Sequence, residues 1–189
     1  MVGQKFNYFE GGRKMTLAAL IAISLMWWTL GLMFLGKGEP KVTGAISGLV
    51  GLLVVVIGVL EGVSGNSFGA GLLYAHGLLY LVTSYALLTG LEDLRSVANV
   101  SLTVMVISAV YCYVWAVGGP IGADGKQLVG KVPYLSFCAA GYVVLTLEVF
   151  LVGHGKLNPK ILAWCLMIWA IVGLWVPAFD LLVYGKLPF

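Results

Sequence analysis

The stretch VTGAISGLVGLLVVVIGVLEGV, residues 42–63, decides the fold class of this chain. Nearly every residue in it is apolar or glycine, and an α-helix needs about 20 such residues to cross the ~30 Å hydrocarbon core of a bilayer. Small residues recur along it at Gly44, Ser47, Gly48 and Gly51, a spacing that lets helix backbones approach closely in lipid. The stretch therefore predicts a closely packed membrane-spanning helix.

The composition of the whole chain agrees with this prediction. Of the 189 residues, 60% are hydrophobic and 10% are charged, whereas soluble domains carry roughly 45–50% and 25%. The mean hydropathy is +1.00. The net charge of +3 comes without a basic cluster, and the three cysteines lie inside apolar runs. These features exclude a nucleic-acid-binding protein, a disordered chain and a disulfide scaffold.

Five further apolar runs resemble the first, so we expect an all-α, polytopic membrane protein. Glycine, proline and charged residues separate six spans, at about 16–35, 42–63, 67–89, 97–118, 131–153 and 159–184. Residues 1–15 form a polar N-terminal tail in this interpretation, and residues 16–189 form one six-helix domain. The first span has no small-residue cleavage site, so we do not interpret it as a signal peptide.

The charges flanking the spans do not decide the orientation. Lysine and arginine are nearly balanced between the two sides, although cytoplasmic loops normally carry the excess. Arg13 and Lys14 favour a cytoplasmic N-terminus, whereas the short loops that all carry Lys or Arg favour the opposite.

Three short connections share one pattern, in which a glycine is followed by four residues and a cation. They are Gly36–Lys41, Gly90–Arg95 and Gly155–Lys160, and the first and third also share Lys-x-x-Pro-Lys. A glycine that closes one helix and a proline that begins the next explain these residue types. Either short loops merely share this chemistry, or a two-helix hairpin is repeated three times around an axis along the membrane normal. Three such hairpins would enclose a path.

Ionisable residues inside the spans are candidates for function, because burying them in hydrocarbon is costly. We identify His76, Glu148 and Asp180. Glu148 and Asp180 lie near opposite ends of the bilayer, so they either mark the two mouths of one route or reach the interface by snorkelling or by pairing with a lysine.

Polar side chains in the third span share one helical face. His76, Tyr80, Thr83 and Ser84 follow the i, i+4, i+7, i+8 spacing of such a face. They form either the wall of a pore or hydrogen bonds between helices. A histidine without Cys, Asp or Glu at ligand spacing does not indicate a metal site, and we expect no cofactor.

Tryptophans mark the sixth span. Trp169 lies in mid-membrane and Trp175 near Pro177, and we count both as candidates for lining a pore. Tryptophans near span ends commonly form interfacial belts, and we assign that role to Trp27, Trp28 and Trp115. The sequence contains no catalytic constellation, so we predict that the protein is not an enzyme.

Several motifs resemble the urea and short-chain amide channel family (AmiS/UreI). The resemblance rests on five segments in family order: Leu35–Thr43 with Gly48–Leu52, Gly77–Leu81 through Gly90–Glu92, Val100–Thr103, Leu147–Glu148, and Trp175–Ala178. It implies three hairpins in a six-helix protomer, a hexameric assembly in a cytoplasmic (inner) membrane, and a pore in each protomer. It also implies that both termini face outward and that the Lys-x-x-Pro-Lys turns face the cytoplasm.

The chain also departs from the family pattern. The outer loops, 61–67 and 119–131, contain none of the histidines associated with acid gating. The paired tryptophans of the fifth helix are replaced by Ala139–Val143, the glutamate of the sixth helix falls near Trp169, and the asparagine of the third helix becomes Ala86.

We therefore predict a passive channel for a small uncharged polar solute such as urea, a short-chain amide or ammonia. A non-transporting subunit of a larger membrane assembly is one alternative. A proton-coupled carrier of small acids that uses His76 and Glu148 is another. The expected partners are membrane lipid, a neutral solute and further copies of the chain or other membrane subunits, but not nucleic acid.

Overall fold

The computed structural model describes residues 8–123, 125 and 127–188, with only the backbone course given for residues 8–16. Six helices are long and apolar enough to cross a membrane, which confirms the predicted all-α polytopic fold. The sixth is divided by a π-helical segment. The elements are α1 (Tyr8–Phe34), α2 (Pro40–Val63), α3 (Ser67–Thr89), α4 (Arg95–Val117), α5 (Pro133–Gly153), α6 (Pro159–Trp169), η1 (Ala170–Trp175) and α7 (Val176–Val183).

The first helix begins earlier than its apolar run. Its apolar part is Leu17–Phe34, but the helix extends back to Tyr8, into the stretch that we expected to be a polar tail. Residues 1–7 of that tail lie outside the described residues.

The helices form a ring in which each one packs against its neighbours in the chain. Helix α1 also packs against α6, η1 and α7, and this contact closes the ring. The closest pairs are α2 with α3, α4 with α5, and α1 with α6. The pairs joined by the predicted hairpin turns, such as α1 with α2, pack less closely.

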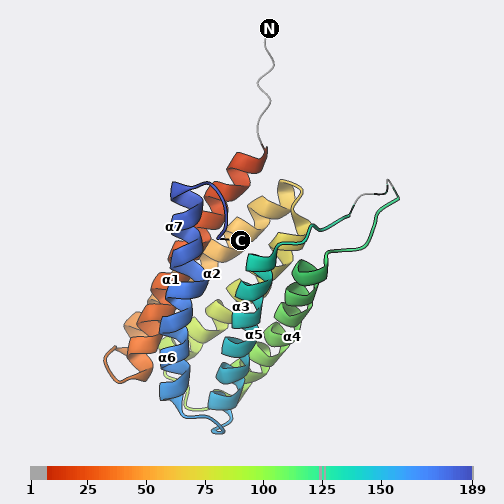
Figure 1. Cartoon of the computed structure of the whole chain (residues 1–189). Coiled ribbons are helices and arrows are strands. Elements are labelled where there is room, and N and C mark those ends of the chain that lie inside the picture. The colour runs from red at the N-terminus through yellow and green to blue at the C-terminus, as the bar shows by residue number, and fades with distance from the viewer. Residues whose placement is uncertain (1–7, 124, 126, 189) are drawn as a thin grey trace.

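The two ends of the bundle differ in the connections that they carry. The start of α1 and the end of α7 lie at one end, which we call the terminal end (Figure 1). The connections 35–39, 90–94 and 154–158 lie at the opposite end, which we call the turn end (Figure 1). An even number of crossings requires this placement of the two chain ends.

The turns after α1 and α5 have the same local chemistry. Gly36 and Gly155 adopt left-handed φ angles of 76° and 67°. In each turn the next amide donates to a carbonyl five residues back, from Lys37 to Leu32 at 2.9 Å and from Lys156 to Leu151 at 2.8 Å. This pattern ends a helix where an L-residue would be strained.

The following helices begin with matching caps. The carboxylate of Glu39 accepts hydrogen bonds from the amides of Lys41 and Val42 at 3.0 and 2.6 Å, and the Asn158 side chain accepts one from the Lys160 amide at 3.0 Å. The backbone donors of Val42 and Lys41 lower the pKa of Glu39 below its ordinary value.

Small residues bring α2 and α3 into direct contact. A Cβ added at Gly44 would lie 2.8 Å from Leu87 Cβ, and one added at Gly77 would lie 2.7 Å from Val55 Cγ2. At this interface the Ser47 hydroxyl donates to the backbone carbonyl of Tyr80 at 3.0 Å. The small-residue spacing in residues 42–63 therefore serves helix packing, as predicted from the sequence.

The π-helical segment η1 follows from Pro177. Proline lacks an amide hydrogen and its ring displaces the carbonyl four residues back, here that of Gly173. Side chains of α5 use the carbonyls in this region: the Tyr134 hydroxyl donates to Val172 O at 2.7 Å, and Cys138 Sγ donates to Gly173 O at 3.4 Å. The carbonyls at the break in the sixth helix thus accept hydrogen bonds from side chains of α5.

Candidate functional site

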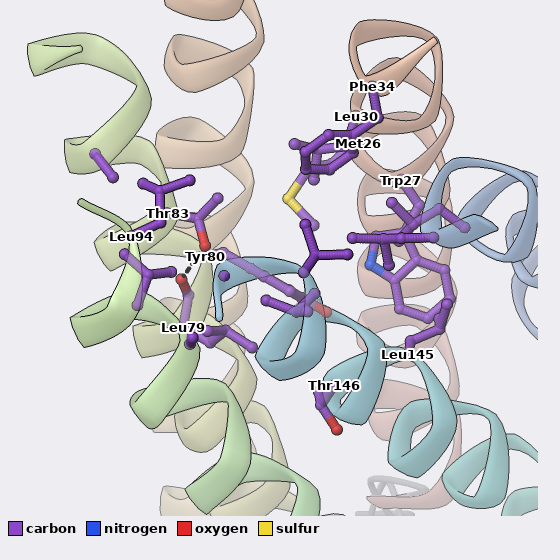
Figure 2. A pocket seen from close by; sticks show the side chains of 18 of the residues that line it. Met26, Trp27, Leu30, Phe34, Leu79, Tyr80, Thr83, Leu94, Leu145 and Thr146 are labelled. Carbon is purple, nitrogen blue, oxygen red and sulfur yellow. Dashed lines mark hydrogen bonds between the residues drawn. The ribbon is translucent and has the colours of Figure 1, made fainter. Parts of the chain in front are cut away.

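A cavity of about 110 Å³ lies inside the ring, in the half of the bundle nearer the turn end. Its lining begins at Met26 on α1, His76 on α3 and Tyr142 on α5, and continues along each helix toward the turn end. The first residues of α4 and of α6 complete the wall. Figure 2 shows the lining side chains converging from several helices on one space.

Three aromatic rings close the inner end of this cavity. The rings of Trp27 and Tyr142 meet edge to face with centroids 5.1 Å apart, and the centroid of the His76 ring lies 4.3 Å from that of Tyr142. These rings come from α1, α3 and α5, so they meet across the ring of helices. A solute that leaves the cavity toward the terminal end must displace them.

An open vestibule of about 570 Å³ lies next to the outer end of the cavity, at the turn end. The vestibule and the cavity share three lining residues, Leu94, Val152 and Gly153. These three residues therefore lie between the vestibule and the cavity. Close packing between α4 and α5 holds this boundary in shape, since a Cβ added at Gly153 would lie 2.6 Å from Ala98 Cβ.

The vestibule carries charged groups, in contrast to the cavity. Glu92, Asp93, Arg95 and His154 all line it. Arg95 donates to both carboxylate oxygens of Asp93, with the shortest contact at 2.7 Å, and these bonds hold the pKa of Asp93 well below its usual range. The Nε2 atom of His154 lies 3.1 Å from the Asn99 side-chain oxygen, which links α5 to α4.

Three of the eight predicted site residues line the cavity: His76, Tyr80 and Thr83. The Thr83 hydroxyl donates to the carbonyl of Leu79 at 2.8 Å, within its own helix. His76 Nδ1 lies 3.1 Å from Leu72 O, and Nε2 lies 3.5 Å from Ser108 Oγ on α4. The Tyr80 hydroxyl is buried and lies beside the Trp27 side chain of α1.

Ser84 belongs to the polar face predicted on the third span, but it does not line the cavity. A Cβ added at Gly48 of α2 would lie 2.6 Å from Ser84 Oγ, so the Ser84 side chain faces the α2–α3 contact. Eight steps of 100° turn Ser84 about 80° from His76 around the helix axis. That difference is enough to move a residue from the ring interior to a helix interface.

The two acidic candidates lie outside the cavity lining. Glu148 lies beside Cys165 of α6, and its Oε2 atom is buried without a hydrogen-bond partner among the described residues. Asp180 is half-buried in α7 and lies near Tyr134 of α5.

The two tryptophans of the sixth span also lie outside the lining. The Trp169 ring packs on Phe137 with centroids 5.1 Å apart and covers Gly141, where a Cβ would lie 2.6 Å from the ring. Trp175 stacks on Trp28 with centroids 5.5 Å apart. Both rings join helices within the bundle.

The assignment of Trp27 to an interfacial belt is wrong. The Trp27 side chain is 4% exposed and lines the cavity. Tyr142 was also missed as a lining residue. Periodicity identifies the residues that share a face of one helix, but it does not identify the face that points into a ring of six helices.

The remaining lining is almost entirely hydrocarbon. Among the described lining residues there is no Asp, Glu, Lys or Arg. Nor do three His, Cys, Asp or Glu side chains come together anywhere in the described chain in a way that could hold a metal ion. The site can therefore accept a small, uncharged molecule, for which a few polar groups offset the loss of water.

Comparisons with known proteins agree with this geometry. Residues 15–185 match the model of the AmiS/UreI family of transporters. Two solved structures of the Helicobacter pylori urea channel have the same fold. The cryoEM structure in the closed state superimposes with a TM-score of 0.76 at 20% identity, covering 90% of this chain and 99% of that chain. The crystal structure gives 0.74 at 21% identity, covering 91% and 99%.

No curated protein sequence matches this chain. The family match spans nearly the whole chain, and the six-helix ring with its axial cavity agrees with it. The prediction of a transport protein rather than an enzyme is confirmed by this match. The chain belongs to the AmiS/UreI family of transporters.

Proposed function

We propose that this protein is a passive channel that conducts a small uncharged polar solute, of the urea and short-chain amide class, along the axis of its helix ring. One observation carries the proposal: an uncharged cavity inside the ring lies next to a vestibule at the turn end, with only Leu94, Val152 and Gly153 shared between their walls. Family membership and the fold shared with the Helicobacter pylori urea channel support it.

The lining favours neutral solutes over ions. An ion that enters a narrow apolar cavity loses its hydration shell, and a channel that conducts ions replaces that shell with charged side chains or carbonyl rings. The described lining has no charged side chain. Moving a neutral amide from water into an apolar medium costs roughly 4–8 kcal/mol when no hydrogen bond replaces those to water. Polar contacts from His76, Tyr80 and Thr83 would offset part of that cost.

The aromatic rings at the inner end close the proposed pathway toward the terminal end. Trp27 and His76 both pack against Tyr142, so these rings lie between the cavity and the terminal end. Passage to the terminal end requires these rings to separate. A passive channel of this kind needs no energy source.

The arrangement gives less support to a proton-coupled carrier. That mechanism would use His76 and Glu148 together, but His76 contacts Ser108 on α4 while Glu148 lies beside Cys165 on α6. Glu148 is also absent from the cavity lining.

Flux into proteoliposomes tests the proposal. Stopped-flow light scattering should show urea or acetamide entry well above that of protein-free liposomes, and an imposed proton gradient should not change the rate. Gradient dependence would favour the carrier. Absence of flux from a folded protein that purifies only with other subunits would favour the accessory-subunit hypothesis.

We also propose that the turn end faces the cytoplasm, that both termini face outward, and that the chain assembles as a homo-oligomer, a hexamer by family resemblance. Lys37 and Lys156 lie in the connections at the turn end. Cysteine placed at either position should react with an impermeant maleimide in inside-out vesicles but not in right-side-out vesicles. Native mass spectrometry from detergent should give the number of subunits.

A further inference from the structure

A histidine at the turn end stands beside the boundary between the vestibule and the cavity. His154 directly follows Val152 and Gly153, which line both spaces, and its half-buried side chain lines the vestibule. It caps the end of α5, so it lies outside the membrane-spanning segment. Imidazole is the side chain that most often changes its charge between about pH 5 and 8. A change of charge at His154 would therefore act next to two of the three boundary residues.

Two contacts fix the position of the His154 ring. Its Nε2 atom lies 3.1 Å from the side-chain oxygen of Asn99, near the start of α4, and the ring packs on Phe150 of α5 with centroids 4.6 Å apart. A carbonyl oxygen only accepts hydrogen bonds, so Nε2 donates in this contact and Nδ1 is the atom that can bind a further proton. The link from α5 to α4 therefore exists in both charge states of the ring.

An ion pair lies on the other side of the boundary from His154. Asp93 and Arg95 line the same vestibule, and they flank Leu94, the third boundary residue. Hydrogen bonds from Arg95 hold the pKa of the Asp93 carboxyl well below its usual range, and the charges of Arg95 and His154 act in the same direction. Asp93 is therefore ionised at every pH at which an imidazole titrates, and it is close enough to His154 for the two charges to interact.

The other charges nearby favour attraction across the boundary when His154 is protonated. Glu92 is a second carboxylate on the connection that carries Asp93, so the carboxylates there outnumber Arg95. On the side of α5, Lys156 adds a positive charge two residues after His154. Among the described residues, no further charged side chain lines the vestibule. Protonation thus increases the positive charge at the end of α5, opposite a connection whose net charge is negative.

On the basis of the proposed function, we propose that His154 is a positioning residue that makes conduction depend on the pH at the turn end. A proton bound at Nδ1 draws the end of α5 toward the carboxylates of the 90–95 connection, and Leu94 approaches Val152 and Gly153. The boundary then narrows, and solute enters the cavity more slowly. In the neutral state this attraction is absent, so acid slows conduction and higher pH restores it.

The chain offers two imidazoles that could produce such a response. Its two histidines are His76 and His154. The loops at the terminal end, 61–67 and 119–131, contain no histidine. His76 lies at the inner end of the cavity, against Tyr142, whereas His154 lies at the vestibule. Substituting each histidine in turn therefore assigns a pH response to one end of the cavity or the other.

Flux at two pH values, equal on both sides of the membrane, tests the inference in the proteoliposome assay. Urea and acetamide stay neutral throughout this range, so their permeation through bare lipid should not change. Entry through the protein should be about twofold to fivefold slower at about pH 5.5 than at about pH 7.5, since an exposed pair of charges contributes little. The difference should shrink at about 1 M NaCl, where the Debye length falls to about 3 Å.

Three variants separate His154 from a general effect of acid. His154→Gln keeps a donor for Asn99 but takes no charge, so the ratio of the rates at the two pH values should fall to about one. His76→Gln is the matched control at the other histidine, and it should keep the wild-type ratio. Asn99→Asp places a carboxylate within hydrogen-bond distance of Nε2, so the midpoint of the pH profile should move upward by about one pH unit. A merely structural contact would not produce that shift.

The outcomes distinguish this inference from the function on which it rests. If the wild-type protein conducts but its rate is independent of pH or rises in acid, the inference is wrong and the channel proposal stands. The same holds if His154→Gln keeps the wild-type ratio, if His76→Gln loses it, or if Asn99→Asp leaves the midpoint unchanged. Each comparison is a ratio within one variant, so a lower basal rate does not affect it. If the folded wild-type protein conducts neither solute at either pH, the channel proposal fails and the inference fails with it.

Discussion

The indole N–H of Trp175 donates a hydrogen bond to the hydroxyl oxygen of Ser24 at 2.5 Å, joining the last apolar span to the first. The Ser24 hydroxyl in turn donates to Ile21 O at 2.7 Å, so it acts as both donor and acceptor. The Trp175 ring also stacks on Trp28, with 22° between the ring planes. These contacts lie where α1 meets η1, which is where the ring of helices closes.

Replacing Ser24 with Ala should destabilise the fold. The indole N–H of Trp175 would lose its acceptor in an apolar environment, which costs about 1–3 kcal/mol. Thermal unfolding in detergent should therefore shift to lower temperature. Thr29→Ala is the matched control on the same helix. The Thr29 hydroxyl donates to Met26 O at 2.9 Å, so its removal leaves no hydrogen-bond donor without an acceptor. A temperature shift as large as that of Ser24→Ala would contradict this interpretation.

The packing of α2 on α3 should depend on Gly77. A Cβ there would lie 2.7 Å from Val55 Cγ2 and 3.2 Å from Gly51 O. Gly77→Ala should lower the free energy of unfolding by about 1–3 kcal/mol, because overpacking forces the helices apart.

Gly62→Ala provides the comparison within the same helix pair. Its added Cβ would meet Ala70 Cβ at 3.6 Å, an ordinary contact. This substitution should be neutral or stabilising, because alanine favours the helix by about 0.5–1 kcal/mol over glycine. Equal effects of the two substitutions, measured by unfolding in mixed micelles, would rule out a specific close approach at Gly77.

Tyr142 should limit the rate of conduction. Its ring contacts both Trp27 and His76 at the inner end of the cavity. Tyr142→Leu should raise solute flux by about tenfold, equivalent to lowering the barrier by ~1.4 kcal/mol. Tyr113→Leu, at a side chain that is 67% exposed on α4, should leave flux at the wild-type rate. A Tyr142→Leu variant that conducts no faster would place the rate-limiting barrier elsewhere.

A bulky residue at Val152 should block the passage at the turn end. Val152 lines both the vestibule and the cavity, so Val152→Trp should reduce flux at least about tenfold by excluding solute from an already narrow passage. Val144→Trp, on the outward face of the same helix, is the control. If Val152→Trp conducts normally, solute enters by another route.

Glu148→Gln should change flux less than about twofold. The Glu148 carboxyl lies outside the cavity lining, beside Cys165, and the substitution keeps its size while removing the charge. The carboxylate is half-buried with only the Cys165 thiol recorded as its side-chain partner, so its neutral replacement should also keep or raise thermal stability. A loss of flux would indicate that Glu148 takes part in conduction and would support the carrier hypothesis.

The fold class was predictable because apolar length is a local property. A run such as residues 42–63 requires a spanning helix wherever it lies in the bundle. Gly36 and Gly155 likewise end their helices through local backbone chemistry, which the spacing of Gly and Pro predicts. The interruption of the sixth helix was not predicted, although Pro177 marks it, because its form depends on whether α5 can bond the freed carbonyls.

The site was predictable only in part. His76, Tyr80 and Thr83 were found because polar residues on one helical face in lipid must face protein or water. The same argument included Ser84, which faces Gly48 instead, and it missed Trp27 and Tyr142. A face of one helix carries no information about which neighbour covers it.

The sequence by itself determined six spanning helices, the turns that end them and a set of polar candidates within them, because hydropathy and turn chemistry act over a few residues. Only the tertiary structure decided that Tyr80, Trp27 and Tyr142 meet around one cavity and that Trp175 contacts Ser24. Those contacts join residues far apart in the chain, and they depend on the rotation of each helix within the ring. That rotation follows from the packing of all six helices together.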